Sequence, residues 1–200
     1  MKNKEVVITN RNITLKENTR SVVMDAGSKE LMEMYSYIVC QNGGDVLDIG
    51  FGMGYSANKM SELSNSYTCI EINPQIYKRA SEWAKNKSNV NLIFGDWYDI
   101  IPQLGLKYDG IFMDTHYDFN YSLFESYCNS IAKEGCILSI YNYHTQREKN
   151  TMNRYEYVLD IDTFTIPVES SHTINWTEYK NSNFIKTSNK IKFPKPQYTI

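Results

Sequence analysis

The chain has 200 residues, of which 42% are hydrophobic, and a formal net charge of -2 at pH 7. This length and composition fit one globular domain with an ordinary buried core and leave too little chain for two full domains. The near-neutral charge gives no general attraction to nucleic acid, and no stretch approaches the ~20 apolar residues of a membrane span.

The N-terminus and the cysteines indicate the expected compartment. The first residues lack the apolar middle of a signal peptide. The four cysteines, Cys40, Cys69, Cys128 and Cys136, mostly lie inside apolar runs and show no C-x-x-C spacing. This arrangement predicts reduced core thiols rather than a disulfide framework or a zinc site. We therefore expect a soluble cytoplasmic protein with no metal and no membrane contact.

Short apolar runs alternate with amphipathic segments from about residue 27 to residue 142. The runs at residues 45–50, 67–72, 91–96, 109–114 and 136–141 predict five strands covered on both faces. Helical spacing occurs at residues 27–39, 55–63, 73–86 and 120–135. Strands and helices that alternate in this way predict an α/β fold, with a doubly wound, Rossmann-like sheet that is mostly parallel.

Both ends of the chain give weaker patterns. Residues 10–13 predict a hairpin turn between two short apolar runs, and residues 162–169 and part of 182–193 have strand composition. We expect a single domain over residues 1–200. Within it, residues 1–22 are a candidate lid, 23–145 the cofactor-binding core, and 146–200 the C-terminal strands and substrate rim.

A glycine-rich loop follows the first predicted strand of the sheet. Gly50, Gly52 and Gly54 stand between that strand and the next helix. Ligands of open parallel sheets bind at such turns, where glycines permit a sharp turn and let a ligand approach the backbone amides. The loop predicts a nucleotide-like cofactor, and its G-x-G-x-G spacing differs from the dinucleotide G-x-G-x-x-G.

Acidic residues at the strand ends indicate which cofactor is bound. Glu71 ends the second strand, 23 residues after Asp48, where a carboxylate can accept both hydroxyls of an adenosine ribose. Asp96 and Trp97 end the third strand, where they can receive the adenine amino group and cover the ring. Asp48, two residues before the first glycine, would repel a pyrophosphate but attract an ammonium and a sulfonium. S-adenosylmethionine is therefore predicted rather than NAD.

The segments "VLDIGFGMGYSANKM", "CIEINPQIYKRASEWA", "GDWYDIIPQL" and "YDGIFMDT" resemble guanidinoacetate N-methyltransferase and related class I arginine N-methyltransferases. The resemblance covers about residues 22–145. It implies the class I methyltransferase type of sheet, with an antiparallel C-terminal strand, and S-adenosyl-L-homocysteine as the product. The cofactor residues that it implies, with those inferred from the strand ends, are Met24, Met32, Asp48, Gly50, Phe51, Gly52, Met53, Gly54, Tyr55, Ser56, Glu71, Ile72, Asp96, Trp97, Tyr98 and Asp114.

The resemblance is weakest on the substrate side. A second substrate carboxylate of the family falls by ungapped matching on Ser28, which has no charge to offer a guanidinium. Asp25 or Glu30 from a neighbouring turn are the candidate replacements. The segment "THYDFNY" after Asp114 also differs from the apolar, proline-containing turn of the family.

The catalytic prediction centres on the end of the fourth strand. Asp114 matches the family's aspartate that faces the acceptor nitrogen, and we expect it to orient a cationic acceptor and accept its proton. His116, Tyr141 and His144 are predicted to form an aromatic, hydrogen-bonding rim, in which either histidine can serve as a base near pH 7.

The predicted function is N-methylation of a small guanidino or amino compound. Three alternatives stay open: an O- or N-methyltransferase of another small metabolite or natural-product intermediate, an enzyme acting on arginine side chains of proteins, and a catalytically inactive cofactor-binding partner subunit. The predicted partner is a small-molecule acceptor, and a homodimer is left open.

Overall fold

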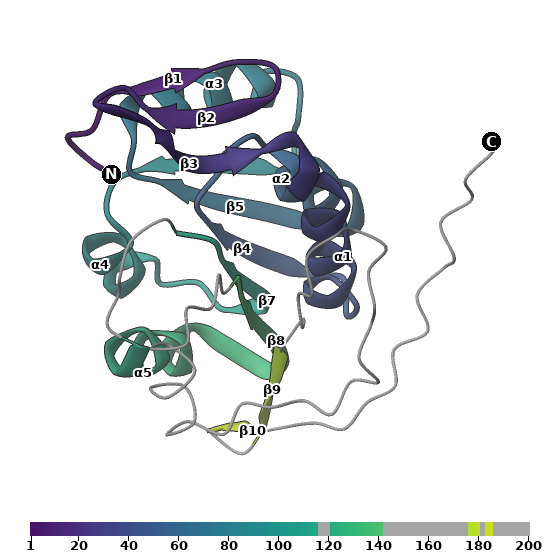
Figure 1. The fold of residues 1–200 in the computed structure, drawn as a ribbon. Helices are drawn as coiled ribbons and strands as arrows, with labels where there is room; N and C mark the ends of the chain where they lie inside the picture. Colours follow the sequence, from purple (N-terminus) through teal and green to yellow (C-terminus); the bar gives the residue numbers. More distant parts are fainter. Residues whose placement is uncertain (116–120, 142–175, 181–182, 186–200) are drawn as a thin grey trace.

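The structure is a computed structural model and describes residues 1–115, 121–141, 176–180 and 183–185. A sheet of seven strands forms its centre, and a smaller sheet of three strands lies at the N-terminus (Figure 1). Among the described residues, no helix has both the length and the apolar composition needed to cross a membrane.

The central sheet has the order β10-β9-β8-β7-β4-β5-β6. Its five parallel strands are β4 (Asp45–Ile49), β5 (Ser66–Glu71), β6 (Val90–Phe94), β7 (Tyr108–Met113) and β8 (Ala132–Ile140). Two antiparallel strands, β9 (Trp176–Lys180) and β10 (Asn183–Ile185), extend the sheet beyond β8. This confirms the predicted doubly wound α/β fold and its antiparallel C-terminal strand.

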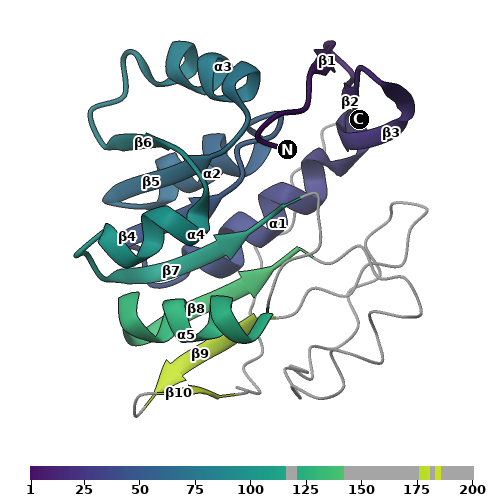
Figure 2. The same ribbon diagram turned by 90° about the vertical axis from the view of Figure 1, so that its left-hand side faces the viewer.

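Helices cover both faces of the sheet, as Figure 2 shows. One face packs against α1 (Lys29–Val39), α2 (Tyr55–Leu63) and α3 (Pro74–Ala84). The other packs against α4 (Trp97–Ile100), the short 3-10 helix η2 (Ile101–Gln103) and α5 (Tyr121–Ile131). Successive strand residues point to opposite faces, so both faces bury apolar side chains, and this explains the continuous apolar runs of the sequence.

The predicted helices are observed, but the last of them is shorter than predicted. Residues 132–135, predicted as its final turn, belong to β8. Lys133 Nζ lies 2.7 Å from carboxylate oxygens of both Asp45 and Asp109, at the starts of β4 and β7. These contacts lie far from residue 133 in the sequence, so local helical spacing does not predict them.

The N-terminal residues form the antiparallel sheet β1-β2-β3. The predicted hairpin is present as β1 (Val6–Ile8) and β2 (Asn12–Leu15). A third strand, β3 (Asn18–Asp25), was not predicted because its side chains are mostly exposed and lack apolar alternation. The side-chain amide of Gln75 on α3 bonds the backbone of Val6 and ties this sheet to the main domain. Another 3-10 helix, η1 (Ala26–Ser28), joins β3 to α1.

The predicted C-terminal strands are only partly described. β10 lies inside the 182–193 segment that was expected to hold a strand, whereas β9 was not predicted. Residues 162–169 lie outside the described part of the chain.

Candidate functional site

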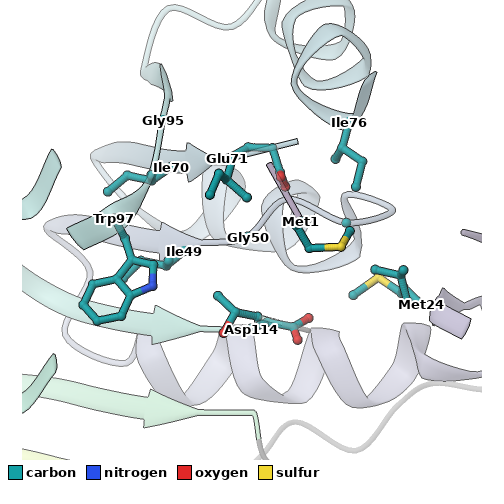
Figure 3. Close-up of a pocket in the computed structure, with 14 residues that line it drawn as sticks. Met1, Met24, Ile49, Gly50, Ile70, Glu71, Ile76, Gly95, Trp97 and Asp114 are labelled. Carbon is teal, nitrogen blue, oxygen red and sulfur yellow. The ribbon is translucent and has the colours of Figure 1, made fainter. Parts of the chain in front are cut away.

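A pocket lies at the carboxyl ends of the parallel strands, at the edge where such sheets bind ligands (Figure 3). It encloses about 550 Å³ of empty space, part of which is its opening to solvent. Its lining residues come from the N-terminal sheet, the ends of four parallel strands and the starts of two helices. They are Met1, Val23, Met24, Ile49, Gly50, Gly52, Ile70, Glu71, Ile72, Ile76, Gly95, Trp97, Asp114 and Thr115.

The pocket includes some of the predicted cofactor residues and omits others. Met24, Gly50, Gly52, Glu71, Ile72, Trp97 and Asp114 line it. The predicted residues that do not line it are Met32, Asp48, Phe51, Met53, Gly54, Tyr55, Ser56, Asp96 and Tyr98.

The glycine loop requires its glycines at two places along the pocket wall. Gly50 has a φ of +103°, and a Cβ built on it would lie 2.0 Å from the carbonyl oxygen of Asp114. Gly52 has a φ of +52°, and its Cβ would lie 2.9 Å from the sulfur of Met24. Both positions therefore combine a left-handed backbone with a close neighbour, which a larger residue does not tolerate. The loop thus exposes bare backbone to the pocket.

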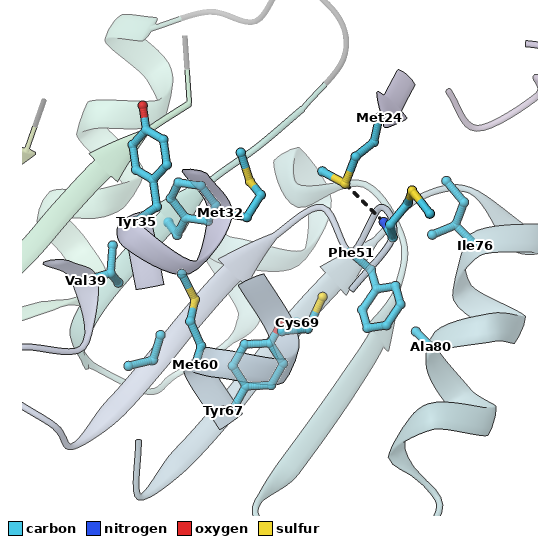
Figure 4. Packing of buried hydrophobic residues seen from close by; sticks show 14 of the residues in the cluster. Met24, Met32, Tyr35, Val39, Phe51, Met60, Tyr67, Cys69, Ile76 and Ala80 are labelled. Atoms are coloured by element: carbon cyan, nitrogen blue, oxygen red, sulfur yellow. Dashed lines mark hydrogen bonds between the residues drawn. The ribbon is translucent and has the colours of Figure 1, made fainter. Parts of the chain in front are cut away.

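The apolar side chains of the loop point into the core instead of the pocket. Phe51 packs on Trp83 with ring centroids 5.3 Å apart, and Met53 is buried in the same cluster (Figure 4). The Met53 N–H donates to the sulfur of Met24 at 3.2 Å, which fixes β3 against the loop. Met32 is fully buried, as expected of ordinary core filling on a helix.

Glu71 is a buried carboxylate at the centre of the pocket wall. It accepts hydrogen bonds from the backbone N–H of Phe51 at 2.9 Å and of Asn73 at 2.7 Å. Burial raises the pKa of Glu71, while these backbone bonds counteract the rise. Because the same carboxylate lines the pocket, it is held rigidly for a ligand with paired donors.

Asp48 lies beneath the loop and is completely buried. Its Oδ2 accepts hydrogen bonds from Tyr67 at 2.6 Å and Ser56 at 3.1 Å, while Oδ1 has no partner. Burial raises the pKa of Asp48 to about 7. Neither Asp48 nor Ser56 lines the pocket, and the Ser56 hydroxyl donates to Asp48 beneath the loop.

Of the two aromatic residues after β6, Trp97 lines the pocket, whereas Tyr98 does not and packs against the core. Trp97 lines the pocket and stacks on Tyr98 with centroids 3.7 Å apart. Asp96 accepts the Tyr98 N–H and caps α4, so its carboxylate does not line the pocket. The indole of Trp97 therefore forms part of this wall, and the capping of α4 explains why the Asp96 side chain turns away from it.

Asp114 follows β7, and its carboxylate is turned toward the same space as Glu71 and Met24 (Figure 3). Burial, followed by the negative charge of Glu71, raises the pKa of Asp114 to about 7. Thr115, beside it, also lines the pocket. A carboxyl group that changes charge near neutral pH can both bind a cation and accept a proton.

The rim prediction is only partly covered by the described residues. Tyr141 lies at the end of β8, and its N–H donates to the carbonyl of Met113 at 2.8 Å, which confirms that it follows the strand beside β7. His116 and His144 lie outside the described residues.

The candidate substrate residues around the start of α1 do not line the pocket. Asp25 and Glu30 are exposed, and Ser28 is half-buried; none of them lines the pocket. Asp25 accepts the Gly27 N–H and caps η1.

Several residues that line the pocket were not predicted from the sequence. Ile49 and Ile70 were read as core strand residues, and their strand-end position is the signal that could have indicated the pocket. Met1 reaches the pocket because Asn73 Nδ2 donates to the carbonyls of Met1 and Lys4. No sequence pattern signals that contact, since it joins residues far apart in the chain.

The described residues contain neither a cluster of metal ligands nor a disulfide. No group of three or more His, Cys, Asp or Glu side chains could hold a metal ion there. All four cysteines are buried and form no disulfide, in agreement with the prediction of core thiols.

The fold and the family agree when the chain is compared with known proteins. Solved structures with similar folds include the N-methyltransferase NodS from Bradyrhizobium japonicum WM9, with a TM-score of 0.60, 13% identity, and coverage of 77% of this chain and 97% of that one. NodS in complex with S-adenosyl-L-homocysteine matches with a TM-score of 0.50, 15% identity, and coverage of 57% and 61%. A putative caffeoyl-CoA O-methyltransferase from Staphylococcus aureus matches with a TM-score of 0.54, 17% identity, and coverage of 78% and 84%.

The family model of guanidinoacetate N-methyltransferase matches residues 10–177, which is more than half of the chain. This range includes the glycine loop, Glu71, Trp97 and Asp114. The chain therefore belongs to the guanidinoacetate N-methyltransferase family and is an S-adenosylmethionine-dependent methyltransferase.

Proposed function

We propose that the protein transfers a methyl group from S-adenosylmethionine to the nitrogen of a small amino or guanidino compound. The observation that carries this proposal is the pair of carboxylates, Glu71 and Asp114, that face one pocket beside an exposed glycine backbone. S-adenosylmethionine carries a sulfonium, an ammonium and two ribose hydroxyls, and this wall suits all three kinds of group.

Different residues of the pocket wall are proposed to bind different groups of the cofactor. Glu71 is the proposed acceptor for both ribose hydroxyls, because its carboxylate is fixed by two backbone N–H groups. Trp97 offers an indole to the adenine. The backbone at Gly50 and Gly52, which lines the pocket, is the proposed contact for the methionine part. The similar fold of NodS in complex with S-adenosyl-L-homocysteine supports this use of the pocket.

The proposed chemistry is an in-line displacement. When bound, S-adenosylmethionine supplies an electrophilic methyl carbon on its sulfonium. The acceptor nitrogen forms a bond to that carbon as the carbon–sulfur bond breaks, and the proton leaves the nitrogen. Asp114 is the proposed proton acceptor, and by holding the cationic acceptor in line it can contribute much of the rate through alignment.

The raised pKa of Asp114 suits this role. An aliphatic amine is protonated at neutral pH, with a reference pKa of ~10, so the acceptor must lose a proton before or during transfer. A carboxyl group with a pKa of about 7 is a stronger base than an ordinary carboxylate. Glu71 causes part of this rise, so one residue serves the cofactor and tunes the base.

The proposal is tested with labelled methyl donor and a panel of amines, guanidines and phenols. We expect methyl incorporation into amines or guanidines, and a loss of at least about 100-fold in kcat for Asp114→Asn. Asp99→Asn is the matched control, because Asp99 is an exposed carboxylate outside the pocket. Incorporation into phenols alone would instead support an O-methyltransferase. Cofactor binding without incorporation into any compound or peptide would support the inactive partner subunit.

A further inference from the structure

Asn73 joins the carboxylate of Glu71 to the first turn of a helix. Its backbone N–H donates to Oε1 of Glu71 at 2.7 Å, and its side-chain Oδ1 accepts from the N–H groups of Gln75 at 3.0 Å and Ile76 at 3.2 Å. The residue is completely buried, and the two bonds to its Oδ1 cap α3. For capping alone, Asn, Asp and Ser are about equally suitable.

The other half of the Asn73 amide holds the N-terminal segment, residues 1–25. Its Nδ2 donates to the backbone carbonyls of Met1 at 3.3 Å and Lys4 at 2.8 Å. Neither Asp nor Ser could make both bonds, since an ionised Asp carboxylate has no donor and a Ser hydroxyl has only one. Asn therefore serves both the cap and the contact with the N-terminal segment, which the other two capping residues cannot do.

Gln75 makes a second attachment to the same segment. Its Oε1 accepts from the Val6 N–H at 2.8 Å, and its Nε2 donates to the Val6 carbonyl at 3.2 Å. One amide thus pairs with both backbone groups of Val6, as a residue of a neighbouring strand would. Two side chains at the start of α3 therefore hold β1 and the residues before it through four hydrogen bonds.

The segment held in this way forms one wall of the pocket. Met1, Val23 and Met24 line it, and Met1 and Met24 lie across the pocket from Trp97 (Figure 3). Met24 is fixed further because its sulfur accepts the N–H of Met53 in the glycine loop. A ligand that fills the pocket contacts these side chains only while the N-terminal segment is docked.

We propose that Asn73 is a positioning residue that couples cofactor binding at Glu71 to docking of the N-terminal segment. This inference rests on the proposed function, in which Glu71 accepts the ribose hydroxyls. Docking completes the apolar wall beside the cofactor, and Asn73 also orients the carboxylate that the ribose meets. Because such coupling is reciprocal, bound cofactor stabilises the docked segment by the same factor as docking strengthens cofactor binding.

The test combines calorimetric titration of S-adenosyl-L-homocysteine with hydrogen exchange of the backbone amides. Asn73→Ser keeps an oxygen that can cap α3 but removes the amide donors to the N-terminal segment. Gln75→Met removes the second attachment and leaves Asn73 and Glu71 untouched. It therefore separates docking of the segment from the orientation of the carboxylate.

Asn89→Ser is the matched control. The Nδ2 of Asn89 also donates to two backbone carbonyls, those of Ser61 at 2.8 Å and Ser64 at 3.3 Å, so this variant loses the same kind of contacts. Asn89 does not line the pocket and stands at the amino end of β6, whereas the pocket lies at the carboxyl ends of the strands. Any general cost of losing a bonded amide therefore appears in the control as well.

In the wild type, S-adenosyl-L-homocysteine should slow hydrogen exchange in β1, β2 and β3 about 10-fold or more, and more than in α5, which adds no described residue to the pocket. Without cofactor, Asn73→Ser and Gln75→Met should each speed exchange in these strands by about 5-fold or more. Each should raise the dissociation constant about 3-fold or more, and the two together about 10-fold or more. Asn89→Ser should change neither quantity.

Other results separate this inference from the function on which it rests. If the wild type binds S-adenosyl-L-homocysteine but exchange in β1, β2 and β3 does not respond, or if both variants bind it as tightly as the wild type, the coupling is refuted and methyl transfer stands. If the folded wild type does not bind it at all, both fail. If Asn73→Ser does not fold, Gln75→Met still decides, because Gln75 is exposed and its replacement leaves the cap of α3 in place.

Discussion

The buried carboxyl group of Asp48 gives a prediction about stability that can be worked from the structure. Asp48 is completely buried, and its pKa rises from 3.8 to about 7. Between pH 3.8 and about pH 7, the folded protein therefore keeps a proton on Asp48 that the unfolded chain has already released. Stability from this group is fully present below pH 3.8 and is lost as the pH rises through 7.

The size of the effect follows from the two pKa values. A difference of about 3 pH units corresponds to roughly 4 kcal/mol of unfolding free energy, at about 1.4 kcal/mol per unit. Asp48→Asn retains an oxygen to accept the bonds from Tyr67 and Ser56 but cannot ionise. Its amide nitrogen has no partner at the site of Oδ1, which costs about 1–3 kcal/mol at every pH.

The assay is urea unfolding of the protein without cofactor between pH 4.5 and 8.5. Between pH 4.5 and 8.5, the difference in unfolding free energy between wild type and Asp48→Asn should change by roughly 3 kcal/mol in favour of the variant, because about 2.5 of the 3 pH units between the two pKa values lie in this range. Asp99→Asn, which changes an exposed carboxylate, should show no such change. Parallel stability curves for wild type and Asp48→Asn would refute the reasoning, because they would mean that Asp48 is ionised in the folded protein at neutral pH.

Three further predictions concern the loop, the base and the far end of the sheet. Gly50→Ala places a Cβ 2.0 Å from a backbone oxygen at a φ of +103°. We therefore expect the unfolding free energy to fall by at least about 3 kcal/mol, and calorimetry should show a melting temperature lower by roughly 6–12 °C. An unchanged melting temperature would contradict this prediction. Because the pKa of Asp114 is about 7, kcat/KM for S-adenosylmethionine should fall about tenfold per pH unit below pH 7; a pH profile that stays flat down to pH 5 would argue against this base. Lys133→Met leaves Asp45 and Asp109 without their shared cation. Because Lys133 is 38% exposed, we expect the unfolding free energy to fall by only about 1 kcal/mol, and this loss should shrink in high salt while methyl transfer stays unchanged. A loss of stability that does not depend on salt would contradict an ionic origin.

The sequence predicted the central sheet well because both of its faces are buried. Strands β4 to β8 are continuous apolar runs, and their order alternates with helices, so local pattern and topology agree. β3 escaped prediction because only Met24 among its side chains is buried. The start of β8 was predicted as helix because its local spacing is helical. In the structure, Lys133 in this segment instead contacts Asp45 and Asp109, which lie far away in the sequence.

The sequence predicted where the pocket lies on the sheet, but it predicted less well which side chains line it. Residues at strand ends, such as Glu71 and Asp114, line the pocket because the topology alone brings them to one edge. Within the glycine loop, the sequence does not tell which side chains turn inward, and Phe51 and Met53 pack in the core.

The central claim is that Glu71 and the glycine loop bind the adenosyl cofactor, and calorimetric titration tests it most directly. S-adenosyl-L-homocysteine should bind wild type with one site per chain. Glu71→Gln should weaken binding at least about 10-fold, because the amide accepts less well from the ribose hydroxyls and places N–H donors where the backbone already donates. No binding to the folded wild type, or equal affinity in folded Glu71→Gln, would contradict the account.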